Sequence, residues 1–255
     1  MAKIIALTNQ KGGVGKTTST ANLGAALARK GKKVLVIDLD PQAHLTTSLG
    51  VKEYELEKTI YEVFKGTVTI NEALIDLGRP GSKLWLLPAS LTFSVADSEF
   101  AGEAGREYLL KEAFQDLDQD FDYALIDCPP SLGLLTINGF TAADEVYIPL
   151  QTEYLAMHGM TQLLQVYNVV KKRVNPNLQI TGIIGTMYDN RKKLNREVIE
   201  KIREHFGTHL FNTMIRTNIS LAEAPSFGQD IFTYKPDSAG AEDYAALADE
   251  VLQRS

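Results

Sequence analysis

Residues 4–18 read IIALTNQKGGVGKTT, an apolar run followed by a glycine-rich turn that ends in Lys-Thr-Thr. The apolar residues are consecutive, which is typical of a strand covered on both faces in a parallel sheet. The residues after Lys16 follow a helical pattern through Leu23, Ala26 and Leu27. A strand, a glycine-rich loop and a helix in this order predict the start of an α/β fold.

The same alternation continues to the end of the chain. Further apolar runs predict strands at 34–38, 84–88, 123–127, 145–150, 180–187 and 209–215. Helical patterns are centred near 16–30, 104–118, 132–142, 155–174, 194–206 and 239–253, and the less regular region 51–82 is expected to be a helical excursion over the surface. No repeat or linker divides the sequence. We therefore expect one domain, 1–255, with a mostly parallel twisted sheet and helices on both faces.

The glycine-rich turn is suited to binding phosphate. Glycines let backbone N–H groups turn inward around an anion, and the following helix adds the positive end of its dipole. Lys16 is expected to reach the β- and γ-phosphates of ATP, and the Thr17 hydroxyl to coordinate Mg²⁺. The strict G-x-x-x-x-G-K-[ST] pattern fails at Gln10, and Lys11 adds a second lysine. The predicted nucleotide contacts in this loop are Lys11, Gly12, Gly13, Val14, Gly15, Lys16, Thr17 and Thr18.

Two later apolar runs end in carboxylates. One reads VLVIDLD and contains Asp38 and Asp40, and the other reads YALID and ends at Asp127. In a parallel sheet the carboxyl ends of the strands form the ligand-binding edge. Asp38 and Asp40 are two residues apart and share one side of an extended chain, so one could support Mg²⁺ while the other orients the attacking water. Asp127 fits the aspartate that holds Mg²⁺ through its water shell.

Four blocks of sequence closely resemble the ParA/Soj partition ATPases, which belong with MinD to the deviant-Walker P-loop NTPases. They are KGGVGKTT (11–18), VLVIDLDPQAHLT (34–46), DYALIDCPPSLGLLTINGF (122–140) and LAEAPSFGQDI (221–231). The resemblance covers essentially the whole chain. It implies a P-loop NTPase fold and a slow, Mg²⁺-dependent ATPase that a partner protein stimulates.

The resemblance also implies roles for particular residues. Lys11 would act in trans on the partner's nucleotide in an ATP-dependent homodimer, with Gly12 at the dimer contact. Lys11, Lys16 and Asp40 would be the catalytic residues, with Asp40 orienting the water. Thr17, Asp38 and Asp127 make up the expected metal site. Asn218 matches the family position that contacts adenine, and we place Arg216 beside it in the nucleotide site.

The resemblance implies a cytoplasmic, nucleoid-associated protein. Such proteins bind ATP, dimerise and coat double-stranded DNA non-specifically, and a ParB-like activator then releases them to move a chromosome, a plasmid or another cargo. The net charge of the chain is −6, yet residues 171–203 carry nine Lys or Arg against three Asp or Glu. Such a segment can supply salt-dependent phosphate contacts. The predicted DNA contacts are Arg191, Lys192, Lys193 and Arg196.

One segment departs from the family pattern. Partition ATPases commonly read P-R-N-V-R-L where residues 216–221 read RTNISL. Arg216 stands where the family has a proline, and Thr217 and Ser220 stand where it has arginines. The arginine at the Ser220 position contacts DNA in the family, so its loss weakens the expectation of DNA binding or shifts the contacts to 191–196.

Five alternative functions can be compared with the sequence. A MinD-like membrane ATPase needs a basic amphipathic C-terminal helix, but AEDYAALADEVLQRS is acidic and mixed, so we expect no membrane partner. An electron-transfer ATPase needs ligand cysteines, and Cys128 alone does not supply them. A dethiobiotin-synthetase-like enzyme would share the loop but is not expected to carry both carboxylate blocks. A module that uses ATP as a structural ligand, and a positioning ATPase for a protein cargo, stay open.

Overall fold

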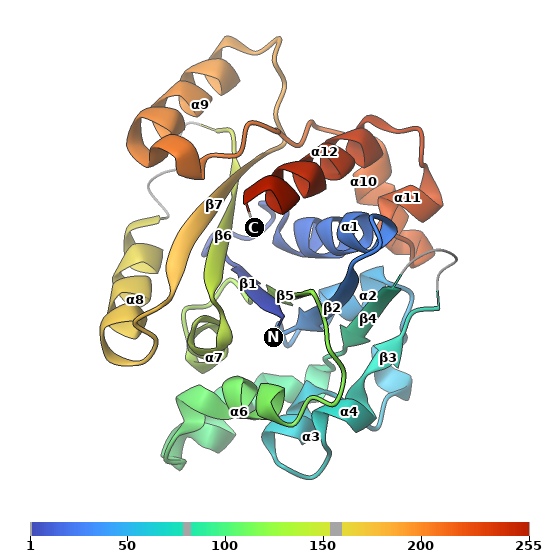
Figure 1. Ribbon diagram of the computed structural model, residues 1–255, viewed down its shortest axis with the longest axis vertical. Helices are drawn as coiled ribbons and strands as arrows, with labels where there is room; N and C mark the ends of the chain where they lie inside the picture. The colour runs from blue at the N-terminus through green and yellow to red at the C-terminus, as the bar shows by residue number, and fades with distance from the viewer. Residues whose placement is uncertain (1, 79–82, 154–159, 255) are drawn as a thin grey trace.

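A seven-stranded sheet in the order β3-β4-β2-β5-β1-β6-β7 forms the centre of the computed structural model, which describes residues 2–78, 83–153 and 160–254 (Figure 1). The strands are β1 Lys3–Leu7, β2 Lys33–Asp38, β3 Ile75–Asp76, β4 Lys83–Leu87, β5 Tyr123–Asp127, β6 Glu145–Gln151 and β7 Gln179–Thr186. All pairings are parallel except that of β3 with β4. The prediction of a mostly parallel α/β sheet is confirmed.

Helices cover both faces of the sheet (Figure 1). They are α1 Lys16–Arg29, α2 His44–Ser48, α3 Ile60–Phe64, α4 Ile70–Ala73, α5 Ala96–Glu99, α6 Leu109–Gln115, α7 Leu134–Ala142, α8 Met160–Arg173, α9 Lys193–Phe206, α10 Ile219–Glu223, α11 Ile231–Tyr234 and α12 Ala239–Arg254. Short 3₁₀ turns occupy Glu53–Glu55, Leu91–Val95, Phe100–Gly102, Arg106–Tyr108, Gly207–His209 and Ala224–Phe227.

The two faces have separate apolar cores, which explains the consecutive apolar residues of the strands. Along β2, Val34 and Val36 pack into the core beneath α1 and α12, whereas Leu35 and Ile37 pack into the core beneath α3, α6 and α7. All four side chains are fully buried. A strand buried on both faces has no polar face, so its sequence does not alternate.

The expected strand at 209–215 is wrong as a regular strand. The segment runs beside β7 and forms isolated bridges, with Phe211 N–H donating to Ile183 O at 3.0 Å and Ile215 N–H to Gly185 O at 2.8 Å. Between them, the N–H groups of Asn212 and Thr213 donate to the Glu250 carboxylate of α12, at 2.9 and 3.0 Å. These two donors are diverted to a side chain, so the ladder is interrupted.

Residues 51–78, the described part of the region 51–82, form the expected helical excursion, with one difference, and residues 79–82 lie outside the described ranges. The described part contains a 3₁₀ turn, α3 and α4, but it also returns to the sheet as the short edge strand β3. Both helices begin at a capping box, Thr59 with Glu62 and Thr69 with Glu72. These reciprocal bonds satisfy backbone donors that a short helix leaves open. Across the described ranges, we find no helix with the length and apolar character needed to cross a membrane.

Candidate functional site

The residues predicted to bind phosphate and Mg²⁺ and to orient the water lie at the carboxyl ends of three adjacent strands, β2, β5 and β1. The glycine-rich loop follows β1, Asp40 follows β2, and Asp127 ends β5. The strand register places Asp127 beside Leu7 on one side and beside Asp38 on the other. The sheet order therefore brings the loop and the carboxylates together, although Asp127 is more than a hundred residues from the loop in sequence.

The loop after β1 has the backbone shape of an anion cradle. Gly13 and Gly15 have φ of 72° and 87°, a left-handed conformation that favours glycine, and Gly15 leads directly into α1. A Cβ built on Gly12 would meet nothing within 4 Å in this chain, so no contact within the protomer requires glycine there. Val14 is buried, and its carbonyl accepts a hydrogen bond from the Thr186 hydroxyl at 2.9 Å.

Two residues that hold this loop in place, Asn9 and Thr186, were not predicted from the sequence. Asn9 is buried, donates to Pro149 O on β6 at 2.8 Å, and accepts from Lys11 N–H at 3.0 Å. Thr186, at the end of β7, is the second anchor. Asn9 stands immediately before the loop, which was an available signal. Nothing in the sequence marked Thr186, because its role depends on the order of the strands.

Lys16 is a buried cation. Lys16 is only 7% exposed, and its Nζ lies 3.4 Å from Lys11 O. Burial lowers the pKa of this ammonium, while the nearby Asp127 and Asp40 carboxylates oppose the shift. A buried charge is costly unless it is well paired, so the surroundings of Lys16 favour an anionic ligand.

Thr17 and Asp127 form the best-defined polar contact of the site. The Thr17 hydroxyl donates to Asp127 Oδ2 at 2.6 Å, and Asp127 is almost fully buried. Burial, followed by the charge of Asp38, raises the pKa of Asp127 well above its usual range. A bound cation would favour the ionised form. Among the described segments, no three His, Cys, Asp or Glu side chains form a group that could hold a metal ion. Mg²⁺ is commonly bound by one or two carboxylates together with substrate phosphates and water.

Asp38 and Asp40 have different surroundings. Asp38 Oδ2 accepts hydrogen bonds from the N–H and the hydroxyl of Thr46, at 2.8 and 2.7 Å, and Oδ1 accepts from Asp40 N–H at 3.2 Å. Burial raises the pKa of Asp38 to about 7, against the opposing effect of the Thr46 bonds. Asp40 Oδ1 accepts from Gln42 N–H at 3.0 Å. Both oxygens of Asp38 are thus engaged within the protein, and its predicted part in the metal site remains a prediction.

Lys11 points toward its own chain at the end of β6. Its Nζ lies 2.9 Å from Gln151 Oε1 and 3.2 Å from Glu153 Oε2. The Lys11 and Glu153 side chains are 45% and 56% exposed, so this is a surface ion pair that can open.

Arg216 contacts α12, and Asn218 stands directly before α10. The Arg216 guanidinium bonds Asp243 at 2.6 to 3.0 Å and Glu242 at 2.7 Å, and these carboxylates raise its pKa. Asn218 caps α10, with Oδ1 accepting from Leu221 N–H at 3.3 Å. The charge of Arg216 is neutralised by α12, so it does not replace the arginine lost at Ser220, which is itself buried.

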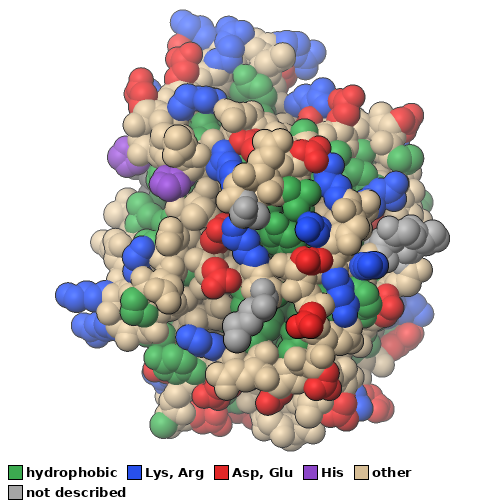
Figure 2. Space-filling model, in the orientation of Figure 1, with side chains coloured by type: hydrophobic (Ala, Val, Ile, Leu, Met, Phe, Trp, Pro, Cys, Tyr) green, Lys and Arg blue, Asp and Glu red, His purple; other side chains and the backbone are tan. Residues whose placement is uncertain are grey.

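The basic segment 171–203 is not one patch. Lys171, Lys172 and Arg173 end α8 and precede β7, whereas residues 191–193 follow β7. Eight strand residues separate them, a span of about 26 Å. Figure 2 shows blue side chains gathered at the end of the molecule where α9 begins.

The four predicted DNA contacts lie together at this end of α9. Arg191 forms a two-pronged bond to Asp189 at 2.9 and 3.0 Å, Arg196 donates to Asn190 O at 2.9 Å, and Lys193 pairs with Glu197 at 3.4 Å. The Arg191 and Lys193 side chains are 86% and 83% exposed. Two of the four cations therefore have an acidic neighbour, but they remain accessible to solvent.

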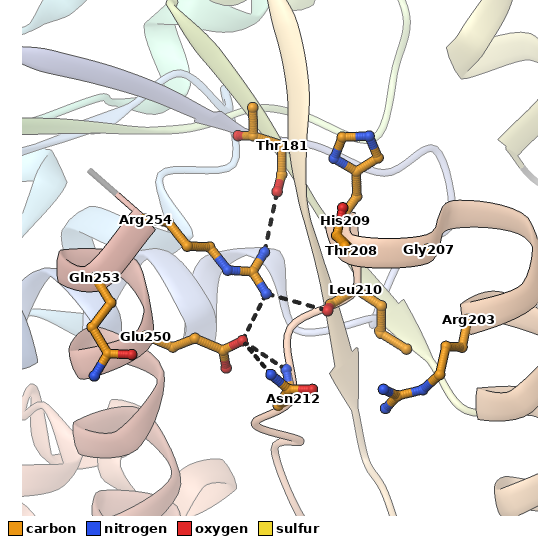
Figure 3. A pocket seen from close by; sticks show the side chains of 10 residues that line it. All are labelled: Thr181, Arg203, Gly207, Thr208, His209, Leu210, Asn212, Glu250, Gln253 and Arg254. Carbon is orange, nitrogen blue, oxygen red and sulfur yellow. Dashed lines mark hydrogen bonds and ion pairs between the residues drawn. The ribbon is translucent and has the colours of Figure 1, made fainter.

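A cavity of about 830 Å³ lies between β7, the turn at Gly207–His209 and α12 (Figure 3). Arg254 projects into it and bonds Glu250 at 2.6 Å, Leu210 O at 3.3 Å and Thr181 O at 3.4 Å. Its guanidinium also stacks on the Phe211 ring. Arg254 is thus a packing residue that joins α12 to β7, and the cavity contains none of the predicted site residues.

Comparison with known proteins agrees with this arrangement. A family model described as an AAA domain matches residues 2–180. The chain is 46% identical to the chromosome-partitioning ATPase Soj of Treponema pallidum, over 100% of this chain and 98% of the relative. It is 41% identical to the chromosome partitioning protein ParA of Caulobacter vibrioides, over 99% and 94%.

A solved structure from Mycobacterium smegmatis, described as cobyrinic acid a,c-diamide synthase with bound ATP analogue and magnesium, superposes with a TM-score of 0.86. It is 38% identical and is covered to 96%, over 100% of this chain. That protein carries the name of a synthase, whereas the two sequence relatives are named for chromosome partitioning and are more similar to this chain. The chain belongs to the ParA/Soj family of chromosome-partitioning ATPases.

Proposed function

We propose that this chain binds Mg²⁺ and ATP at the loop Lys11–Thr18 and hydrolyses ATP as a homodimer that partitions DNA. The observation that carries the proposal is the buried Lys16 ammonium at the mouth of the loop, next to the 2.6 Å contact between Thr17 and Asp127. The M. smegmatis structure, which has an ATP analogue and magnesium, supports it.

Each residue of the site has a role that follows from its position. The N–H groups of the loop and Lys16 bind the phosphates, and the Thr17 hydroxyl with Asp127 holds the hydrated Mg²⁺. The metal supplies positive charge that offsets the charge developing on the phosphoryl group. Asp40 orients the attacking water from the end of β2. Because the reaction is mainly a matter of positioning and electrostatics, small displacements of these groups affect its rate.

Dimerisation would complete the site. Lys11 is exposed and is held by a surface ion pair, so it can leave its own chain and reach the nucleotide of a second protomer. A cation supplied in trans stabilises the transferred phosphoryl group. We assign Gly12 to the contact between protomers, since a side chain there would meet nothing in its own chain and the space is free for the partner.

DNA binding and activation belong to the proposal as well. The exposed cations at the start of α9 would contact phosphates of double-stranded DNA, and the two copies in a dimer would raise the affinity by avidity. A ParB-like protein would stimulate hydrolysis and release the dimer from the nucleoid. We propose adenine contact for Asn218, and Arg216 could join it only by leaving Asp243 and Glu242.

A protein cargo is the second candidate. Ser220 is buried where the family has a DNA-contacting arginine, and the charge of Arg216 is neutralised, so the chain has fewer free cations on this side. DNA retention by the ATP-bound dimer separates the two candidates. Retention on DNA that is lost as salt is added favours the DNA-partitioning function. No retention on DNA favours the protein-cargo function.

Two variants test the core of the proposal. Lys16→Ala should abolish ATP binding in calorimetry, and unchanged affinity would refute the assignment of the loop. Asp40→Ala should bind ATP, hydrolyse it much more slowly than the wild type in a single turnover, and accumulate as a dimer on a sizing column. Wild-type hydrolysis by Asp40→Ala would refute the catalytic assignment.

A further inference from the structure

Thr46 connects two neighbouring strand ends through one hydroxyl group. The hydroxyl donates to Asp38 Oδ2 at 2.7 Å and accepts from Ala89 N–H at 3.0 Å. Asp38 ends β2, and Ala89 lies two residues beyond β4, its neighbour in the sheet. Thr46, Asp38 and Ala89 are each fully buried, so water does not compete for these bonds.

The turn between Asp38 and Thr46 carries Asp40 and is strained. Ala43 has φ of 53°, a left-handed conformation that is unfavourable for alanine, and it is fully buried. Its N–H donates to Asp40 O at 2.9 Å, which closes the turn. A strained backbone persists where its surroundings over-determine it. Here those surroundings are the bonds at Asp38 and the docking of α2.

The helix that follows is too short to be stable by itself. α2 has five residues, and an isolated helix of this length does not form in water. It is held by the burial of Leu45 and by the two bonds from Thr46 to Asp38. Asp38 in turn accepts from the N–H of Asp40 at 3.2 Å. The same carboxylate therefore fixes both ends of the turn.

From this geometry we propose that Asp38 and Thr46 are positioning residues for Asp40, which they hold at the place where the attacking water is oriented. The inference rests on the proposed role of Asp40 in ATP hydrolysis. It assigns Asp38 an indirect part in the reaction, through the turn, in place of direct contact with the metal.

The first test removes the Thr46 hydroxyl. Thr46→Val should lower kcat by between about tenfold and about 100-fold, because a displacement of about 1 Å in a positioning group has effects of this size. The KM for ATP should stay within about threefold. Thr46→Ser should restore kcat. Thr47→Val is the matched control, because the Thr47 hydroxyl bonds Ala43 O at the helix N-cap and His44 O in the first turn, and not Asp38. Equal rates for Thr46→Val and Thr47→Val would overturn the proposal.

Repeating Thr46→Val in the Asp40→Ala variant shows whether the loss of kcat depends on Asp40. In Asp40→Ala, the further change Thr46→Val should leave the residual single-turnover rate unchanged within about twofold, since residues acting as a unit are non-additive. The same fold loss in both backgrounds would indicate a general structural role and overturn the proposal. If Asp40→Ala itself hydrolyses ATP at the wild-type rate, the proposed function fails instead.

Asp38→Asn keeps the test available if Thr46→Val does not fold. The amide oxygen can still accept from Thr46, but the amide NH₂ would face the N–H of Asp40, so kcat should fall as in Thr46→Val. The Mg²⁺ concentration that gives half-maximal rate should not change. A raised Mg²⁺ requirement with unchanged kcat would identify Asp38 as a direct metal ligand and refute a positioning role.

Discussion

Removing the charge of Glu153 should strengthen the ATP-dependent dimer. In the protomer, Lys11 Nζ lies 3.2 Å from Glu153 Oε2, and in the proposed dimer Lys11 has to leave this partner. Exposed ion pairs of this kind are worth about 0.2 to 1 kcal/mol. With about 0.5 kcal/mol for each protomer, the two pairs oppose dimerisation by about 1 kcal/mol, so Glu153→Gln should tighten the dimer about fivefold.

The measurement is the dimer dissociation constant with saturating ATP, by sedimentation, in the Asp40→Ala background so that ATP persists. Glu55→Gln is the matched control, since Glu55 forms a similarly exposed pair with Lys52, at 2.9 Å. The gain should shrink at high salt, which screens exposed charges. A dimer that is unchanged or weaker in Glu153→Gln would refute the reasoning that Lys11 exchanges one partner for another.

Three further predictions follow from other parts of the molecule. Changing Arg191, Lys192 and Lys193 to Glu should eliminate retention of the ATP-bound dimer on DNA at low salt. The same change at Lys171, Lys172 and Arg173, at the far end of β7, should have a smaller effect, and equal losses would move the DNA surface. Thr8→Val should raise the free energy of unfolding by about 1 kcal/mol in chemical denaturation. The reason is that Thr8 Oγ1, buried at the end of β1, is the one buried side-chain polar atom in the described parts of the chain without a hydrogen-bond partner; a loss of stability would contradict this. Cys128 is fully buried, and burial together with the Asp127 charge raises its pKa, so a thiol reagent should modify it only after unfolding. Rapid labelling of the native protein would contradict this account.

The ends of the strands could be predicted because the sequence marks them chemically. Each buried strand is a run of apolar residues, and in two cases the run stops at an aspartate. Parallel strands place all such ends at one edge, so Thr17 and Asp127 were expected near the same edge, and in the structure the Thr17 hydroxyl donates to Asp127 Oδ2 at 2.6 Å. The helices flanking the strands were also expected, because their apolar periodicity is local information.

The surroundings of individual side chains could not be predicted in the same way, because they depend on which strands are neighbours. Lys11 meets Gln151 and Glu153 because β6 lies beside β1, and no local pattern specifies that order. The run at 209–215 has the buried apolar residues of a strand, among them Leu210, Phe211 and Ile215. Whether it pairs as a strand was decided by Glu250, which lies more than thirty residues later.

The pair Asp38 and Asp40 shows how far a spacing argument reaches. Two residues apart, they were expected to share one side of an extended chain, and either could have served the metal or the water. The chain does not remain extended, because it turns at Asp40 and passes through the left-handed Ala43. Thr46, which stands at the end of the quoted block 34–46, then occupies one oxygen of Asp38. In the proposed mechanism, the different roles of the two aspartates therefore depend on Thr46, eight residues after Asp38, and substitutions at Thr46 should affect hydrolysis more than ATP binding.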